Sequence, residues 1–135
     1  MDSEPGNNLV PITNWSELQP LFKNGELPIP FAQEILLFES HVAGTGYVQE
    51  IQQLADQLHE GDLLQLCREP DNTHDDLAIK VLNADGKKLG YVPRSWNTIP
   101  AHLMDGGKIL FAKVTSKQLL DDWLRIKIQV FLRDL

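Results

Sequence analysis

The sequence of 135 residues has little of what marks secreted or membrane proteins. It contains one cysteine, Cys67, which excludes an internal disulfide and indicates a reducing compartment. Its longest apolar run, residues 35–38, is far shorter than the roughly 20 residues that cross a bilayer. The first five residues, MDSEP, lack the basic and apolar regions of a secretory signal. We therefore expect a cytoplasmic protein without a membrane span.

Positive charge is also scarce. The formal net charge of −7 argues against a protein that coats nucleic acid through bulk electrostatics. The imbalance lies mostly in residues 1–39, where Lys23 is the single basic residue against six carboxylates. Residues 40–135 are close to neutral, so a local basic groove is compatible with the composition.

Residues 1–34 contain five of the eight prolines, and this density excludes long regular elements. We interpret this segment as an acidic, proline-rich N-terminal arm, followed by one domain over residues 35–135. Asn14 and Glu17 resemble a helix-capping pair, which predicts one short helix in the arm. The large apolar side chains Trp15, Phe22 and Phe31 are expected to pin the arm onto the main domain.

The pattern after residue 34 is typical of short strands. We predict strands at residues 35–42, 62–68, 77–82, 89–92, 109–115 and 123–132, and helices at 50–60, closed by Gly61, and 98–104. Asp85-Gly86 predicts a tight hairpin turn. In the last strand Leu124, Ile126, Ile128 and Val130 alternate with largely cationic neighbours, so one face is core. Cys67, flanked by leucines, is predicted as a small core thiol.

No βαβ rhythm is present. The elements therefore predict a mostly β fold, a small six-stranded antiparallel barrel of the OB-like or SH3-like kind, with two short helices and the N-terminal arm.

Signals for catalysis or cofactors are absent from the sequence. The histidines His41, His59, His74 and His102 are isolated, and with one cysteine they do not have the spacing of a zinc site. The aspartates of residues 69–76 lack the ligand pattern of an EF-hand loop. No serine lies in a G-x-S-x-G context, and Gly44-Thr45-Gly46 lacks the Lys-Ser/Thr of a phosphate loop. We expect no enzyme, no metal and no cofactor.

A binding surface is the remaining candidate. Aromatic rings beside cations suit single-stranded nucleic acid, because bases stack on the rings while Lys and Arg neutralise phosphates. The candidate residues are Tyr47, Arg68, His74, Asp75, Tyr91 and Arg94. An ordinary structural interpretation stays open at this point: two half-buried tyrosines at the barrel rim, arginines that are solvated or paired with Asp75 or Glu69, and a loop histidine.

Several segments, in this order, carry a resemblance. V-A-G-T-G-Y ends at Tyr47, R-E-P-x-N-x-x-D-x-x-A-I-x-V begins at Arg68, and D-G-x-x-x-G-Y-V-P-R ends at Arg94. Together they resemble the HIRAN domain family over about residues 36–132. That family is found fused to Swi/Snf-type helicase-like ATPases and as small standalone modules in bacteria. The resemblance implies an OB-like barrel with two helices.

The resemblance also implies nucleic-acid binding and, as in the fork-remodelling members, capture of the 3′ end of single-stranded DNA. Tyr47 would stack on the terminal base, and Asp75 would accept a hydrogen bond from the 3′-hydroxyl. His74 stands where those members carry an aromatic residue, so it would stack or hydrogen-bond. Arg94, with Lys80 or Arg68, would hold phosphates beside Tyr91. Gly46 replaces a basic side chain of those members, which lowers the expected affinity.

We thus expect a non-catalytic DNA-binding module in DNA repair or processing. Two alternatives stay open. One is a protein-interaction module in which the groove or a barrel edge accepts a peptide strand. The other is an accessory to a separate helicase-like ATPase or nuclease.

Overall fold

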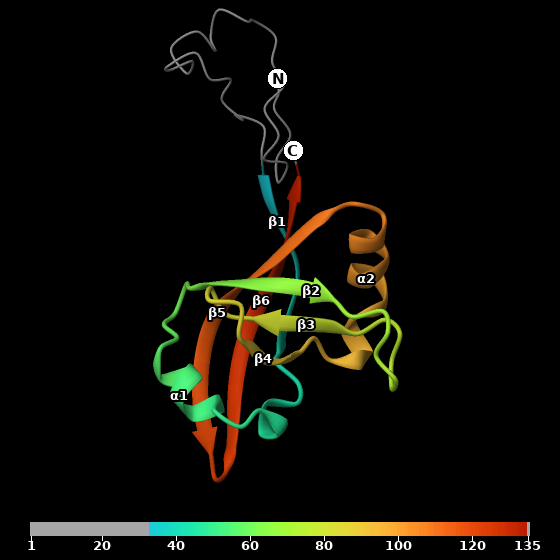
Figure 1. The fold of residues 1–135 in the computed structure, drawn as a ribbon. Helices are drawn as coiled ribbons and strands as arrows, with labels where there is room; N and C mark the ends of the chain where they lie inside the picture. The colour runs from blue at the N-terminus through green and yellow to red at the C-terminus, as the bar shows by residue number, and fades with distance from the viewer. Residues whose placement is uncertain (1–32, 135) are drawn as a thin grey trace, which may run out of the picture.

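The computed structural model describes residues 33–134, which form one six-stranded antiparallel sheet with two α-helices (Figure 1). The strands follow the order β1-β6-β5-β2-β3-β4 across the sheet. Their bounds are β1 Gln33–His41, β2 Leu63–Arg68, β3 Ile79–Leu82, β4 Lys88–Tyr91, β5 Ile109–Leu120 and β6 Trp123–Asp134. The predicted fold class, a mostly β six-stranded antiparallel barrel with two helices, is confirmed.

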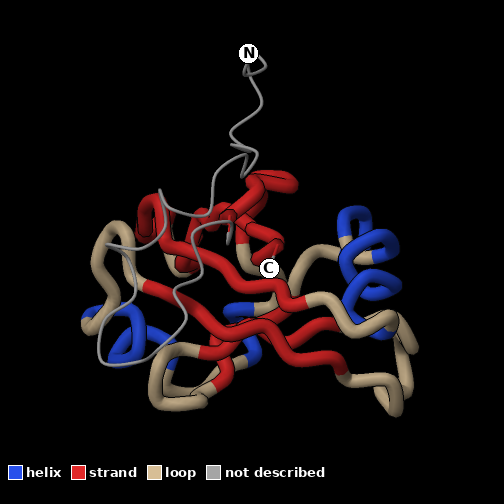
Figure 2. Tube along the Cα trace, turned by 90° about the horizontal axis from the view of Figure 1, so that it is seen from above, coloured by secondary structure: helices blue, strands red, loops and turns tan. Residues whose placement is uncertain are grey.

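The sheet curls so that its two edge strands, β1 and β4, come together. Just beyond the end of β1, the backbone N–H and C=O of Ala43 exchange hydrogen bonds of 2.7 and 2.8 Å with Tyr91 of β4. This closure needs a glycine, because a Cβ on Gly90 would lie 2.3 Å from the carbonyl oxygen of Ala43. We call this junction the seam of the barrel. Figure 2 shows the strands in the middle of the molecule, with helices α1 and α2 at opposite sides of them.

The core follows the predicted period of two. Ile126, Ile128 and Val130 of β6 are fully buried and Leu124 nearly so, while Arg125 and Lys127 face outward. The hairpin at Asp85-Gly86 is also confirmed: Gly86 has φ +83°, and the side-chain oxygen of Asn83 accepts from the backbone N–H groups of Asp85 and Lys87.

The first helix is shorter than predicted. Helix α1 spans Ile51–Asp56 rather than 50–60, because the next two N–H groups, of Gln57 and Leu58, bond to carbonyls three residues back and tighten the last turn. Gly61 therefore does not cap the helix, and its N–H donates instead to the carbonyl of Val114 on β5, at 2.7 Å. The predicted apolar face is present, with Leu54, Ala55 and Leu58 buried.

The prediction that Cys67 is a core thiol is wrong. Cys67 is exposed, because strand alternation places Leu64 and Leu66 on the inner face of β2 and Cys67 on the outer one.

Two short 3₁₀ helices and one α-helix complete the fold. The 3₁₀ helices are η2, Thr45–Tyr47, and η3, Arg94–Trp96. Helix α2, Thr98–Asp105, follows η3 and contacts β2 and β5, and its Ala101 is fully buried. No helix in residues 33–134 is long and apolar enough to cross a membrane. The predicted arm helix and its anchors Trp15, Phe22 and Phe31 lie outside the described residues, and β1 begins two residues before the predicted domain boundary.

Candidate nucleic-acid interface

The two tyrosines of the predicted site lie together at the seam. Tyr47 ends η2 and is 94% exposed, whereas Tyr91 ends β4 and is half-buried. A Cβ placed on Gly44 would lie 4.0 Å from an atom of each ring, so Gly44 lies next to both of them. Gly44 also has φ +77°, which other residues adopt at a cost. η2 is fixed below by Thr45, whose buried hydroxyl donates to the carbonyl of Leu124, at 2.8 Å.

Tyr91 is tied to the loop of residues 69–78, which connects β2 to β3. Its hydroxyl donates a 2.7 Å hydrogen bond to Glu69 Oε1, and this bond raises the pKa of the tyrosine. Hydrogen bonds from Asn72 and Tyr91 lower the pKa of Glu69 below its ordinary value, so this carboxylate is ionised at neutral pH. Two lysines surround the pair: Lys80 Nζ lies 3.8 Å from Glu69 Oε2, and Lys88 Nζ lies 5.0 Å from the centre of the Tyr91 ring.

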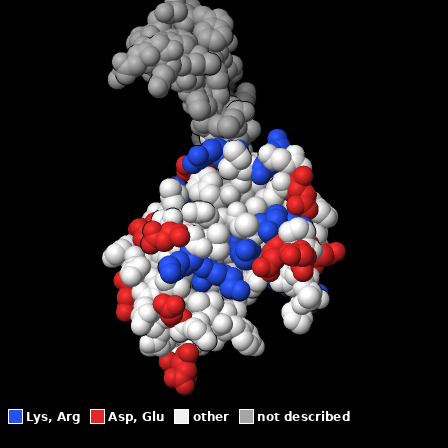
Figure 3. All heavy atoms as spheres, in the orientation of Figure 1, with Lys and Arg blue, Asp and Glu red and all other residues white. Residues whose placement is uncertain are grey.

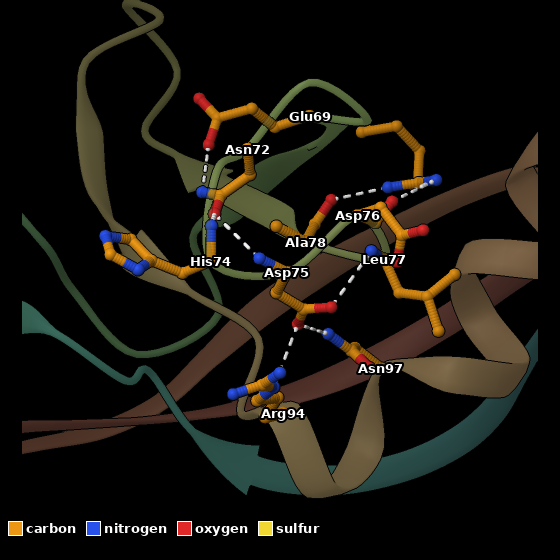
Figure 4. A network of polar contacts seen from close by, with 10 residues as sticks. Glu69, Asn72, His74, Asp75, Asp76, Leu77, Ala78, Arg94 and Asn97 are labelled. Atoms are coloured by element: carbon orange, nitrogen blue, oxygen red, sulfur yellow. Dashed lines mark hydrogen bonds and ion pairs between the residues drawn. The ribbon is translucent and has the colours of Figure 1, made fainter.

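Asn72 organises the rest of this loop (Figure 4). Its Nδ2 donates to Glu69 Oε1 at 2.7 Å, while its Oδ1 accepts from the backbone N–H groups of His74 and Asp75 at 2.8 and 3.0 Å. The His74 ring takes no part in these bonds and points away from them (Figure 4). The loop therefore presents an exposed imidazole at a position fixed by Asn72.

Asp75 sits at the centre of the second half of the site. Its Oδ1 accepts from the N–H of Leu77 at 3.0 Å, and its Oδ2 accepts from Asn97 Nδ2 at 2.8 Å. Arg94 Nε lies 3.7 Å from the same Oδ2, with its side chain 75% exposed. The bond from Leu77, then those from Asn97 and Arg94, lower the pKa of Asp75. Asp75 is therefore a partly buried, ionised carboxylate held in a fixed orientation.

Arg68 has a different position from the other candidates. Its side chain is 13% exposed, and it pairs with Asp105 of α2, Nε to Oδ1 at 2.9 Å. The guanidinium also donates to the carbonyls of Ala78 and Asp76, at 2.7 and 3.0 Å. Its donors are thus directed at the end of the 69–78 loop that leads into β3 and at α2, so Arg68 holds the loop in place rather than facing solvent.

The structure therefore brings most predicted site residues together around one network of hydrogen bonds and ion pairs. It runs from Tyr91 through Glu69 and Asn72 to Asp75 and Arg94, with Tyr47 beside Tyr91, Lys80 beside Glu69 and His74 on Asn72. We call this group, Tyr47, Lys80, His74, Asp75, Tyr91 and Arg94, the candidate interface. The ordinary structural interpretation expected two half-buried tyrosines at the barrel rim. Tyr91 fits this expectation, and Tyr47 does not.

The residues that connect the interface through hydrogen bonds and close packing were not predicted from the sequence. Glu69 and Asn72 lie within the R-E-P-x-N segment, so their motif positions were a usable signal. Gly44 and Asn97 gave none, because their roles depend on neighbours brought close only by the fold.

Charge of both signs meets at this face. Figure 3 shows basic side chains across the face that carries β3 and β4, with an acidic group beside them. Within residues 33–134, no three His, Cys, Asp or Glu side chains cluster in a way that could hold a metal ion. The interface is therefore an arrangement of rings, cations and fixed carboxylates.

Comparison with protein families assigns the domain to a family. Residues 35–133 match the HIRAN domain. The chain belongs to the HIRAN domain family. The match covers the sheet except the first two residues of β1 and the last residue of β6, and it includes both α-helices and every residue of the candidate interface. No curated protein matches the sequence.

Solved structures agree on the fold. A crystal structure of a protein from Lactobacillus plantarum is 30% identical, with a TM-score of 0.71, covering 77% of this chain and 99% of that one. The HIRAN domain of human HLTF, in a crystal structure, is 20% identical with a TM-score of 0.59, covering 74% and 78%. An NMR structure of the HLTF HIRAN domain in its DNA-bound conformation is 20% identical with a TM-score of 0.51, covering 73% and 79%.

Proposed function

We propose that this HIRAN domain is a non-catalytic module that binds the 3′ end of single-stranded DNA in DNA repair or processing. The observation that carries the proposal is the 94% exposed ring of Tyr47, held beside Tyr91 at the seam. A tyrosine this exposed contributes little to folding, yet its backbone is fixed by Thr45 and Gly44. The HLTF HIRAN domain, which shares the fold, has a DNA-bound conformation.

The rings would hold the terminal base. Stacking of a base on an aromatic side chain contributes about 1–3 kcal/mol and tolerates any base. Tyr47 offers its ring to solvent, and the exposed His74 imidazole offers a second planar surface on the 69–78 loop. Binding through these groups would favour unpaired bases over a duplex, whose base faces are already stacked.

Asp75 would select a free chain end. Each carboxylate oxygen accepts more than one hydrogen bond, so Oδ1 and Oδ2 can accept a 3′-hydroxyl while they keep Leu77 and Asn97. A phosphate at the same place would bring two negative charges together, because Asp75 is ionised at neutral pH. The fixed carboxylate thus both attracts the hydroxyl and repels a continuing strand.

Two cations would hold the phosphates that precede the end. Arg94 is tied to Asp75 by an exposed contact of 3.7 Å, which is weak enough to be exchanged for a phosphate. Lys80 makes a comparable contact of 3.8 Å with Glu69. Arg68 would act through the loop that it holds. Any catalysis would come from a helicase-like ATPase or nuclease acting in trans.

Fluorescence anisotropy with labelled oligonucleotides tests the proposal. We expect a single strand with a 3′-hydroxyl to bind tightest, the same strand with a 3′-phosphate roughly tenfold more weakly, and a blunt duplex more weakly still. In Asp75→Asn the preference for the hydroxyl should shrink, with the 3′-phosphate strand binding as well as before or better. Equal binding of all three oligonucleotides would refute end recognition.

A further inference from the structure

An apolar groove lies beside the candidate interface and is not used by it. It has a volume of about 350 Å³ and runs between β1 and the segment that follows Arg94, and it is lined chiefly by Leu37, Phe38, Trp96, Ile99 and Pro100. Ile99 is 71% exposed and Trp96 51% exposed. The Trp96 ring stacks on Phe38, with centres 5.3 Å apart, so one wall of the groove is a rigid aromatic pair. Exposed apolar side chains grouped in this way are typical of a surface that binds another segment or molecule.

One wall of the groove is also a free strand edge. Within the described residues, β1 pairs with β6 along one side, and on its other side the first strand contact is the seam at Ala43, beyond its end. A β-bulge between Leu36 and Phe38 turns this part of the strand. An unpaired edge offers backbone hydrogen bonds to an added segment, and the groove beside it offers an apolar site for side chains.

We propose that residues 1–32 of this same chain fold back over this groove and place their large apolar side chains in it. The segment joins β1 at Gln33, four residues before Leu37, a distance of about 13 Å along a strand. A chain of 32 residues can reverse and reach several times that far. The segment contains Trp15, Phe22 and Phe31.

Charge and tethering favour this occupant over a separate partner. Residues 1–32 contain Lys23 as their single basic residue against Asp2, Glu4, Glu17 and Glu26. Arg94, 75% exposed, stands at the start of the segment that lines the groove, so an acidic chain meets a cation there. A segment linked this closely is also present at a millimolar effective concentration, which a partner reaches only at high abundance. The proposal goes beyond DNA binding and does not depend on it.

Nuclear Overhauser effects in the isotope-labelled full-length chain test this directly. We expect cross-peaks between the methyl groups of Ile99 and ring protons of Trp15, Phe22 or Phe31. Ile99→Glu removes these methyl groups, so its readout is the amide signals of residues 1–32, which should shift because a carboxylate then lies in the groove. Since Ile99 is 71% exposed, the domain should stay folded. Leu119→Glu is the matched control, since Leu119 is 58% exposed on β5 and does not line the groove.

A mixture of labelled and unlabelled chains separates the alternatives. Cross-peaks within one copy that are kept in Leu119→Glu, together with amide shifts of residues 1–32 that Ile99→Glu causes and Leu119→Glu does not, support the proposal. Cross-peaks only between differently labelled copies would assign the groove to a second molecule and overturn it. The absence of cross-peaks in the unsubstituted chain, or amide signals of residues 1–32 that do not respond to Ile99→Glu, would overturn it as well.

Discussion

At the scale of single residues, Asn72 joins the two halves of the candidate interface. One amide group bonds to Glu69, which holds Tyr91, and also to the backbone of His74 and Asp75. The position of the ring at the seam and the position of the carboxylate are therefore set by the same side chain. Asparagine can do this because it donates and accepts at once.

Tyr47 provides the sharpest test at this scale. Tyr47→Ala should weaken binding of a 3′-hydroxyl single strand by about 1–3 kcal/mol, roughly 5- to 150-fold, because it removes the exposed stacking surface. Fluorescence anisotropy measures the affinity. Thermal unfolding of the variant should match the unsubstituted protein, because the side chain is 94% exposed.

Tyr47→Phe is the matched control, since it keeps the ring and removes the hydroxyl. It should retain most of the affinity. If Tyr47→Ala binds as well as Tyr47→Phe, the ring does not stack on a base and the proposed contact is wrong.

The residue types of the interface were predictable from the order of the sequence segments, but their connections were not. Arg68 shows why: its partner Asp105 is 37 positions away, and only the packing of α2 against β2 brings the two together. The sequence therefore indicated a cation, whereas the fold assigns its donors to the 69–78 loop.

At the scale of elements, local periodicity predicted some segments well and others poorly. The alternation in β6 predicted the inner face of the strand, because every second residue of a strand faces the same side. The same alternation, with Leu64 and Leu66 on the inner face, places Cys67 on the outer face, so the prediction of a core thiol from its leucine neighbours was wrong. Helix α1 kept its apolar face but ended early, because helix ends depend on hydrogen bonds that periodicity does not report.

Gly90 tests the closure of the barrel. Gly90→Ala should lower the free energy of unfolding by about 1–3 kcal/mol, because its Cβ would lie 2.3 Å from the Ala43 oxygen and 2.7 Å from Val42 Cγ1. Urea denaturation monitored by circular dichroism measures the change. Gly46→Ala is the control, since a Cβ there meets no atom within 4 Å, and it should change stability by less than about 0.5 kcal/mol. Equal midpoints would show that the seam accommodates a side chain.

At the scale of the whole molecule, the net charge of −7 limits how the domain can hold DNA. Long-range attraction is weak, so affinity has to come from a few close contacts. With Arg94 and Lys80 as the phosphate contacts, the logarithm of the binding constant should fall with the logarithm of salt concentration with a slope of about −1.4.

Arg94→Ala should reduce that slope by about 0.7, as measured by anisotropy across a salt series. Arg133→Ala is a suitable control, because Arg133 is 43% exposed on β6 and lies 3.7 Å from Glu34, outside the interface. A slope that Arg94→Ala leaves unchanged would remove Arg94 from the phosphate contacts.

Acid should destabilise the domain through its fixed carboxylates. The folded-state pKa values of Glu69 and Asp75 lie below their ordinary values of 4.5 and 3.8, so these groups stabilise the fold at neutral pH. That contribution is lost as the pH falls through the folded pKa values. In Glu69→Gln the free energy of unfolding should fall less steeply below about pH 4.5 than in the unsubstituted protein or in Glu60→Gln, an exposed control. Parallel curves for all three would contradict this.

The seam joins the first and last strands through a single residue pair, whereas β5 and β6 are paired along most of their length. Tyr91 lies on the β4 side of this junction. Tyr47 lies on the other side, four residues after Ala43. A nucleotide that contacts both rings would bridge the two strand edges at the seam, which the sheet itself joins through only one residue pair. Nucleotide binding would then also stabilise the closure of the barrel. The effect should be seen first as slower hydrogen exchange of the amide protons of Ala43 and Tyr91.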